Sequence, residues 1–188
     1  MPDRSHVIPP KGLTPEKSAW RWRVSPTIAI RPMTTADNAA VAQLIRAVSA
    51  EYELTADKGY SVADPTLDNL AAVYAPERHI YLVVEKEGHI VGGCGIGALQ
   101  GFDDTCELQK MYFLPEIRGR GLANAISKLC MNFASRCGYD KIYLETTYLL
   151  PEALRLYRHL GFRELPQHLG NTGHNACEIP MQMSLVTV

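Results

Sequence analysis

The sequence lacks any uninterrupted apolar run long enough to cross a lipid bilayer. Residues 1–26 also lack the apolar core of a secretory signal, so we expect a cytoplasmic protein without a membrane partner. The formal net charge is -1, from 19 basic and 20 acidic side chains. Because no excess of positive charge is available to neutralise phosphates, we expect no nucleic acid partner.

Metal-site patterns are also missing. The five cysteines form no CxxC pair, and no Cys/His spacing is of the zinc type, so we expect no bound metal. Reduced and mostly buried thiols are the interpretation of these cysteines. His168 and His174 fall in a predicted loop and are interpreted as ordinary loop histidines.

A length of 188 residues with ordinary apolar content predicts one domain with a continuous core. Residues 1–26 are polar, contain prolines and show no period, apart from the letters WRWR at 20–23. We interpret residues 1–26 as a polar extension outside the core, and we place a single domain at 27–188.

Hydrophobic periodicity predicts alternating strands and helices in this domain. Strands are expected on both sides of a hairpin turn at Glu87-Gly88, and at residues 27–32, 105–115, 141–146 and 176–186. Helices are expected at residues 34–52, 67–74, 121–137 and 151–162. The order β-α-α-β-β-β-α-β-α-β is that of a mixed α/β sheet.

Two glycines flanked by arginines stand where the third predicted helix begins, in LPEIRGRGLANAISKL. The first amides of a helix have no intrahelical partner. Gly119 and Gly121 allow those N–H groups to approach a bulky ligand. The helix dipole, with Arg118 and Arg120, favours an anion, so a phosphate group is predicted here.

Several interpretations of this turn compete. The Walker A pattern requires a lysine followed by serine or threonine after its last glycine, and GRGLAN has neither. The dinucleotide fingerprint requires a glycine or alanine where Asn124 stands. A glycine-rich turn with solvated arginines and no ligand is the plain structural alternative.

A family resemblance favours another phosphate ligand. MYFLPEIRGRGLA resembles the acyl-CoA-binding signature Q/R-x-x-G-x-G/A of the GNAT N-acetyltransferase superfamily, with Arg118, Gly121 and Ala123 at its fixed positions. ALRLYRHLGF resembles the last core helix of that family, in which a tyrosine precedes a Gly-Phe end. The resemblance spans about residues 27–188. It implies an αβα-layered N-acyltransferase fold, whose central mixed sheet contains a splayed strand pair at the CoA site.

The resemblance also implies that acetyl-CoA is the acetyl donor, bound as a cosubstrate. The exposed backbone of Met111, Tyr112 and Phe113 is expected to hydrogen-bond the pantetheine arm as an added strand would. The turn is expected to hold the pyrophosphate through Arg118, Gly119, Arg120, Gly121, Leu122, Ala123 and Asn124.

Two residues are candidates for catalysis. Tyr157 matches the family's helix tyrosine beside the CoA sulfur, and we predict that it protonates the departing thiolate. The alternative is a core role, because Ala153, Leu156 and Leu160 share its helical face. Glu107 matches the catalytic glutamate of the histone-acetylating branch of the family.

Glu107 is predicted to be the general base. It precedes Phe113 by six residues, so in an unbulged strand the two share one face. The alternatives are a chain of waters or another residue as the base, with Glu107 as a salt-bridge partner or a substrate anchor.

The acceptor pocket is expected between residues 52–64 and 164–177, which frame it in the family. The following side chains are candidates to attract or line a cationic amine: Glu51, Tyr52, Glu53, Asp57, Tyr60 and Asp64.

The resemblance implies an N-acetyltransferase that moves the acetyl group of acetyl-CoA to a primary amine of a small molecule, peptide or protein by direct attack on the thioester. The main alternative is a non-catalytic acyl-CoA sensor or interaction module, and a different nucleotide-binding fold is a third. Homodimers are frequent in the family, but no part of the sequence identifies an interface.

Overall fold

The computed structural model describes residues 20–172 and 176–185. Its strands are β1 (Trp22–Arg23), β2 (Ile28–Pro32), β3 (Ile80–Lys86), β4 (His89–Ala98), β5 (Thr105–Phe113), β6 (Lys141–Thr146), β7 (Arg163–Glu164) and β8 (Ile179–Ser184). Its α-helices are α1 (Asn38–Glu51), α2 (Leu70–Val73), α3 (Leu122–Arg136) and α4 (Pro151–Leu160). Every predicted strand and helix is present, and among the strands of the described residues the sequence patterns missed the two-residue β1 and β7.

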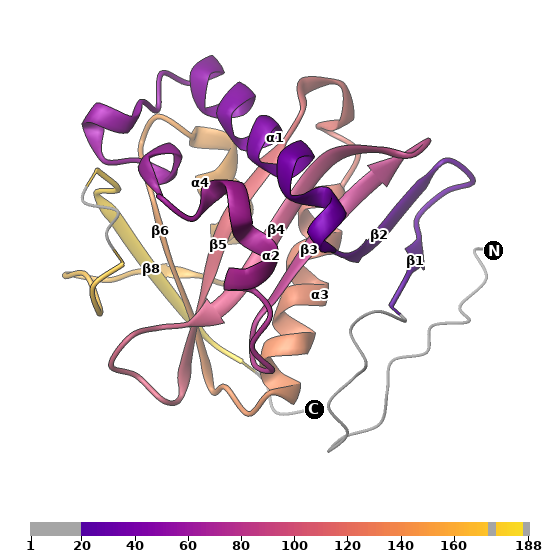
Figure 1. The fold of residues 1–188 in the computed structure, drawn as a ribbon. Helices are drawn as coiled ribbons and strands as arrows, with labels where there is room; N and C mark the ends of the chain where they lie inside the picture. The colour runs from indigo at the N-terminus through magenta and orange to yellow at the C-terminus, as the bar shows by residue number, and fades with distance from the viewer. Residues whose placement is uncertain (1–19, 173–175, 186–188) are drawn as a thin grey trace.

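The strands form one sheet in the order β1-β2-β3-β4-β5-β6-β8-β7. Only β5 and β6 are paired in parallel, and the other neighbours are antiparallel. The core on one face packs under α1 and α2, and the core on the other face packs under α3 and α4 (Figure 1). The prediction of a mixed α/β sheet between helical layers is confirmed.

The N-terminal edge of the sheet includes part of the predicted extension. Trp22 and Arg23 pair with residues 29–30 of β2. Trp20 meets the ring of Phe133 on α3 edge-on, with the ring centroids 6.2 Å apart. Both tryptophans pack against the core. Residues 1–19 lie outside the described residues.

The strands β5 and β6 separate after a short contact. Their pairing joins Thr105–Glu107 to Lys141–Tyr143, whereas β5 continues to Phe113 and β6 to Thr146. Beyond Glu107, β5 is therefore no longer paired with β6, and a gap opens between the two strands. This is the splayed strand pair that the resemblance implies.

The strand β5 also contains a β-bulge. Gly93 of β4 pairs with Tyr112, but Gly95 pairs with Gln109, so two residues of β5 oppose one of β4. Lys110 lies in the bulge with a left-handed φ of 49°. Such a backbone in a non-glycine residue is uncommon and requires support from its surroundings.

The bulge reverses the alternation of side chains along β5. Leu108 and Phe113 both pack in the core under α3, although they are five residues apart. Glu107 accepts a hydrogen bond from Gln109, which itself accepts one from Tyr74 in the core under α2. The expectation that Glu107 shares the face of Phe113 is therefore wrong, because the extra residue moves Glu107 to the α1/α2 face.

Glycines in β4 allow aromatic rings to lie directly on the strand. A Cβ at Gly93 would lie 2.6 Å from Cε1 of Tyr81, and a Cβ at Gly95 would lie 2.6 Å from Cζ of Tyr74. Tyr81 is held in place because its hydroxyl donates to the carbonyl of Lys110 over 2.9 Å. The rings therefore fix the strand beside the bulge.

Gly93→Ala should lower the free energy of unfolding by roughly 1–3 kcal/mol, because the new methyl group collides with the ring of Tyr81. Urea denaturation would measure the loss. The same change in a Tyr81→Leu background should cost much less, since the colliding ring is gone. An equal loss in both backgrounds would show that the ring contact is not the reason for glycine.

Candidate functional site

A groove of about 390 Å³ runs beside the open edge of β5 and is lined also by the start of α3 and by α4. Arg120 is exposed on the same turn but is not part of the lining. The other predicted cofactor-binding residues all border the groove: Met111, Tyr112, Phe113, Arg118, Gly119, Gly121, Leu122, Ala123 and Asn124. The fold thus brings together two sequence segments that the signature placed in one site.

The turn before α3 presents backbone N–H groups. Gly119 and Gly121 have φ values of 71° and 74°, and no atom lies within 4 Å of a Cβ built at either position. The N–H of Ala125 donates to the carbonyl of Gly121, and no side chain caps the helix. The amides that precede Ala125 are therefore at the open end of α3, the geometry that favours an anion.

Asn124 adds a polar group to this end of the groove. Its Oδ1 is buried and has no hydrogen-bond partner within residues 20–172 and 176–185. A buried amide without a partner costs free energy, so a bound ligand that hydrogen-bonds Asn124 would gain affinity. The open amides and this orphaned group fit a ligand with both phosphate and hydrogen-bonding groups.

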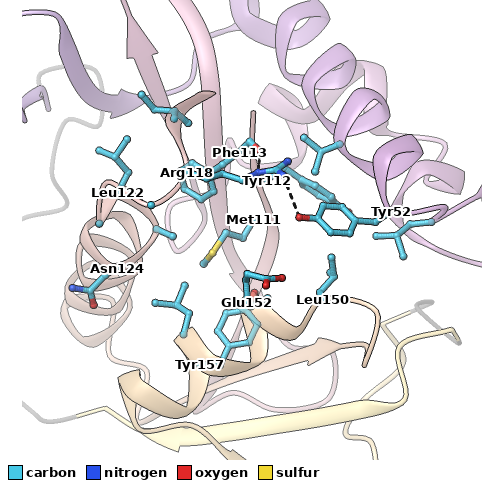
Figure 2. A pocket seen from close by; sticks show the side chains of 18 residues that line it. Tyr52, Met111, Tyr112, Phe113, Arg118, Leu122, Asn124, Leu150, Glu152 and Tyr157 are labelled. Carbon is cyan, nitrogen blue, oxygen red and sulfur yellow. Dashed lines mark hydrogen bonds between the residues drawn. The ribbon is translucent and has the colours of Figure 1, made fainter. Parts of the chain in front are cut away.

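Arg118 borders the groove with its charge paired to a carboxylate. Its Nε donates to the carbonyl of Phe113 over 2.9 Å, and its two Nη atoms lie 2.5 and 2.7 Å from the carboxylate of Glu51. Nη1 also donates to the hydroxyl of Tyr52, as Figure 2 shows. The Arg118 side chain therefore ties the turn to the end of α1, and Glu51 balances its charge at the rim of the groove.

Tyr157 on α4 is buried and lies at the end of the groove nearest the strand gap. Its ring contacts Phe162 edge-on, with the centroids 5.8 Å apart. Burial raises the pKa of Tyr157 above its usual value, so the phenol is protonated at neutral pH. Packing in the core and a role at the site are compatible, because Tyr157 belongs to the core under α3 and α4 and also borders the groove.

A second cavity of about 70 Å³ lies in the gap between β5 and β6. It shares Leu54, Met111, Tyr112, Leu150 and Tyr157 with the groove, so the two spaces adjoin. Glu107 and Glu145 line the second cavity from the two diverging strands.

Glu107 is 4% exposed and accepts a hydrogen bond of 2.5 Å from Nε2 of Gln109. Burial raises the pKa of Glu107 to about 7; the Gln109 hydrogen bond opposes this rise, Glu145 adds to it and Lys110 opposes it. A carboxyl group with this pKa exchanges a proton near neutral pH, as a general base must.

Two of the four acidic residues expected to attract an amine are paired with cationic side chains. Glu51 pairs with Arg118, and Asp64 pairs with Nζ of Lys110 over 2.7 Å. Burial favours the neutral form of Asp64, but Lys110 and Thr66 outweigh it and lower its pKa to about 2. The carboxylates of the second cavity, rather than this loop, therefore supply negative charge at the gap.

Glu53 and Asp57 are exposed on the surface of the loop. Tyr60 lines the second cavity, and Tyr52 lines the groove.

Sequence reasoning missed Glu145. Along β6, Ile142 and Leu144 point to the core under α3, whereas Tyr143 donates a hydrogen bond to Glu145 on the other face. The available signal was a single carboxylate directly after the run of residues 142–144 in β6. His168, interpreted as an ordinary loop histidine, has its Nδ1 3.1 Å from Glu145; His174 lies outside the described residues.

Among the residues that the structure describes, no group of three or more His, Cys, Asp or Glu side chains could hold a metal ion. In the same part of the chain, no helix is long and apolar enough to span a membrane.

Comparison with known proteins identifies the family. Residues 43–162 match the Acetyltransferase (GNAT) family. The uncharacterized N-acetyltransferase YjgM of Escherichia coli is 55% identical over 157 residues, which are 83% of this chain and 94% of that protein. The N-acetylaspartate synthetase of Rattus norvegicus is 32% identical over 99 residues, 53% of this chain and 31% of that protein.

The fold agrees with this relationship. The structure of YncA, a putative acetyltransferase from Salmonella typhimurium, was determined with its cofactor acetyl-CoA. It superposes on this chain with a TM-score of 0.66 at 24% sequence identity, over 86% of this chain and 96% of YncA. The matched family segment includes β5, the glycine turn, α3 and α4, which together form the groove. The chain therefore belongs to the acetyltransferase (GNAT) family and is an acetyl-CoA-dependent acetyltransferase.

Proposed function

We propose that the protein transfers the acetyl group of acetyl-CoA to a primary amine by direct attack of the amine on the thioester. One observation carries the proposal. Glu107, from the α1/α2 face, and Tyr157, from the α3/α4 face, border the same cavity at the gap between β5 and β6. A candidate base and a candidate acid thus approach one point from opposite sides of the sheet.

The groove is suited to the donor. The amides of residues 119–124 at the open end of α3 would hold the pyrophosphate, with Asn124 beside them. The edge of residues 111–113 that faces the gap between β5 and β6 would bind the pantetheine arm as an added strand. This arrangement directs the thioester along β5 toward Tyr157.

The chemistry needs two proton transfers. The amine nitrogen attacks the thioester carbon and forms the C–N bond, and the C–S bond breaks as the tetrahedral intermediate collapses. Glu107 accepts the proton that the nitrogen loses, and Tyr157 donates its hydroxyl proton to the thiolate. A phenol, with an ordinary pKa of about 10 that burial raises further at Tyr157, is a weaker acid than a thiol of about 8.5, so this donation accompanies late C–S cleavage.

The charge at the gap supports a cationic acceptor. Lys110 is already paired with Asp64, so Glu107 and Glu145 leave the second cavity with net negative charge once Glu107 is ionised. An amine carrying an ammonium group would be attracted, whereas a carboxylate beside the amine would be repelled. The similarity to N-acetylaspartate synthetase makes aspartate the informative contrasting acceptor.

A panel of amines assayed with acetyl-CoA for release of free thiol tests the proposal. The panel should contain aliphatic monoamines, diamines, aspartate and a peptide with a free amino terminus. We expect thiol release with at least one amine that lacks a carboxylate. Acetyl-CoA binding by calorimetry without thiol release from any amine would favour the non-catalytic sensor instead.

Gly121→Ala should weaken acetyl-CoA binding about tenfold, because a left-handed alanine costs roughly 1–2 kcal/mol and the turn would shift to relieve it. Isothermal titration would measure the change. Gly138→Ala is the matched control: Gly138 has φ 80°, no atom within 4 Å of a built Cβ, and lies after the far end of α3. Equal loss of affinity in both variants would remove the turn from the binding site.

A further inference from the structure

Glu145 is a carboxylate at the gap with hydrogen-bond partners on both oxygens, yet the proposed proton transfers do not use it. Its side chain is 3% exposed. Oε1 accepts from the hydroxyl of Tyr143 over 2.6 Å and lies 3.1 Å from Nδ1 of His168, and Oε2 accepts from the hydroxyl of Thr172 over 2.6 Å. The hydroxyl of Tyr143 in turn accepts the N–H of Leu169 over 3.2 Å.

These contacts fasten one segment to β6. His168, Leu169 and Thr172 all belong to the connection between β7 and β8, and Cys177 of the same connection lines the second cavity. The carboxylate of Glu145 accepts hydrogen bonds from the hydroxyl groups of Tyr143 and Thr172, and it can accept a third from Nδ1 of His168. Both oxygens of a carboxylate accept hydrogen bonds, whereas the NH₂ group of a glutamine at this position would face one of these donors and lose that contact.

Glu145 also contributes charge to the environment of Glu107. The groups that interact with Glu107 come from its own strand, from the end of α2, from β6 and from the connection before β8: Gln109, Lys110, Tyr74, Tyr143, Glu145 and Cys177. The charge of Lys110 is balanced by Asp64. Glu145 is therefore the negative group in this set that is not balanced by a lysine or arginine in the described structure.

We propose that Glu145 is a positioning residue of the transfer reaction, which is fixed at the second cavity by its contacts with residues 168–172 and keeps a negative charge beside Glu107. This rests on the proposed amine acetylation at the same gap. Glu145 itself lines the second cavity, so the contacts that fasten residues 168–172 to β6 also fix one wall of the space that the amine would enter. The negative charge disfavours ionisation of Glu107 and so makes it a stronger base once ionised.

Glu145→Gln should change two quantities at once. The KM for the amine should rise about tenfold through loss of the fixed wall, while the KM for acetyl-CoA stays the same. The acidic limb of kcat/KM should move to lower pH by roughly half a unit, because removal of a negative charge lowers the pKa of Glu107. Glu164→Gln, an exposed carboxylate on β7 paired with Arg158, is the control and should change neither.

Two further variants separate the effect of the lost contacts on the amine KM from the effect of the lost charge on the pH profile. Thr172→Val removes one contact but keeps the carboxylate, so the amine KM should rise and the acidic limb should stay in place. Glu145→Asp keeps the charge and should restore the limb. Unchanged amine KM and pH profile in Glu145→Gln would overturn the proposal; should that variant not fold, an unchanged amine KM in Thr172→Val would do so.

Failure of the role proposed for Glu145 can be distinguished from failure of the proposed function. If the unaltered protein acetylates an amine and these variants behave like it, only the role of Glu145 is lost. If the unaltered protein acetylates no amine in the panel, the proposed function fails, and the role of Glu145 with it.

Discussion

Tyr157→Phe is expected to lower the rate of acetyl transfer about a hundredfold, at the lower end of the range for general acids, because a thiolate is a fair leaving group even without a proton. The affinity for acetyl-CoA should change little. Phenylalanine keeps the ring that packs against Phe162 and removes only the hydroxyl. Single-turnover measurement of thiol release gives the chemical step, and titration with acetyl-CoA gives the affinity.

Tyr139→Phe is the matched control for this change. Tyr139 is a buried tyrosine between α3 and β6, with its hydroxyl 3.4 Å from the carbonyl of Arg78, and it lines neither the groove nor the second cavity. It should reduce stability slightly and leave the rate unchanged. If Tyr157→Phe keeps the rate of the unaltered protein, Tyr157 has a packing role only and the thiolate leaves without its help.

The parts of the fold that depend on local chemistry could be predicted from the sequence. Gly119 and Gly121 mark a turn that needs left-handed backbone, and the structure has positive φ at both. Glu87 and Gly88 mark the hairpin between β3 and β4, again with positive φ at both residues. Each feature is determined by a few neighbouring residues, so a single sequence contains the information.

The parts that depend on contacts between distant segments could not be predicted. The bulge at Lys110 is stabilised by Tyr81 of β3 and by Asp64 of the loop after α1, and nothing in the letters TCELQKMYF specifies either partner. The same holds for Arg118, whose partner Glu51 is 67 positions away. The signature predicts that Arg118 is at the turn, but only the packing of α1 decides where its charge goes.

The bulge changes the interpretation of the site. Without it, Glu107 would lie on the face of the core under α3, on the same side of the sheet as Tyr157. With it, the carboxyl group and the phenol approach the gap from opposite faces. In the proposed reaction, an acceptor that meets Glu107 and a donor that meets Tyr157 need not pass each other, which suits direct transfer without an acetylated enzyme residue. Cys177, the cysteine that lines the second cavity, supports this, because burial raises its pKa to about 12 and so disfavours the reactive thiolate.

Glu107→Gln is expected to lower kcat/KM for the amine about a hundredfold at pH 8. Gln keeps a carbonyl that can accept the hydrogen bond of Gln109, so the shape of the cavity is retained and only the base is lost. In the unaltered protein, Glu107 loses its proton as pH rises through about 7, so its contribution grows up to that pH and is constant above it.

The pH dependence must be separated from the titration of the amine, which itself gains reactivity as pH rises. The ratio of kcat/KM between the unaltered protein and Glu107→Gln cancels the amine, which is common to both. Because the ratio follows the ionised fraction of Glu107, it should rise about tenfold per pH unit below 7 and level off above it. A ratio that does not vary with pH would assign the base to a water chain or another residue.

The free energy of unfolding provides a control for Glu107→Gln, because ionisation of Glu107 lowers stability whereas it raises activity. The pKa of Glu107 is raised by burial from 4.5 in the unfolded chain to about 7, so the native state is destabilised as pH rises from 4.5 through 7, and the full cost remains above 7. Glu107→Gln removes this cost. At pH 8 the Tm of Glu107→Gln should therefore be no lower than that of the unaltered protein, although most of the activity is lost. A lower Tm together with lost activity would instead indicate that Glu107 is needed to hold the strands β5 and β6 in place.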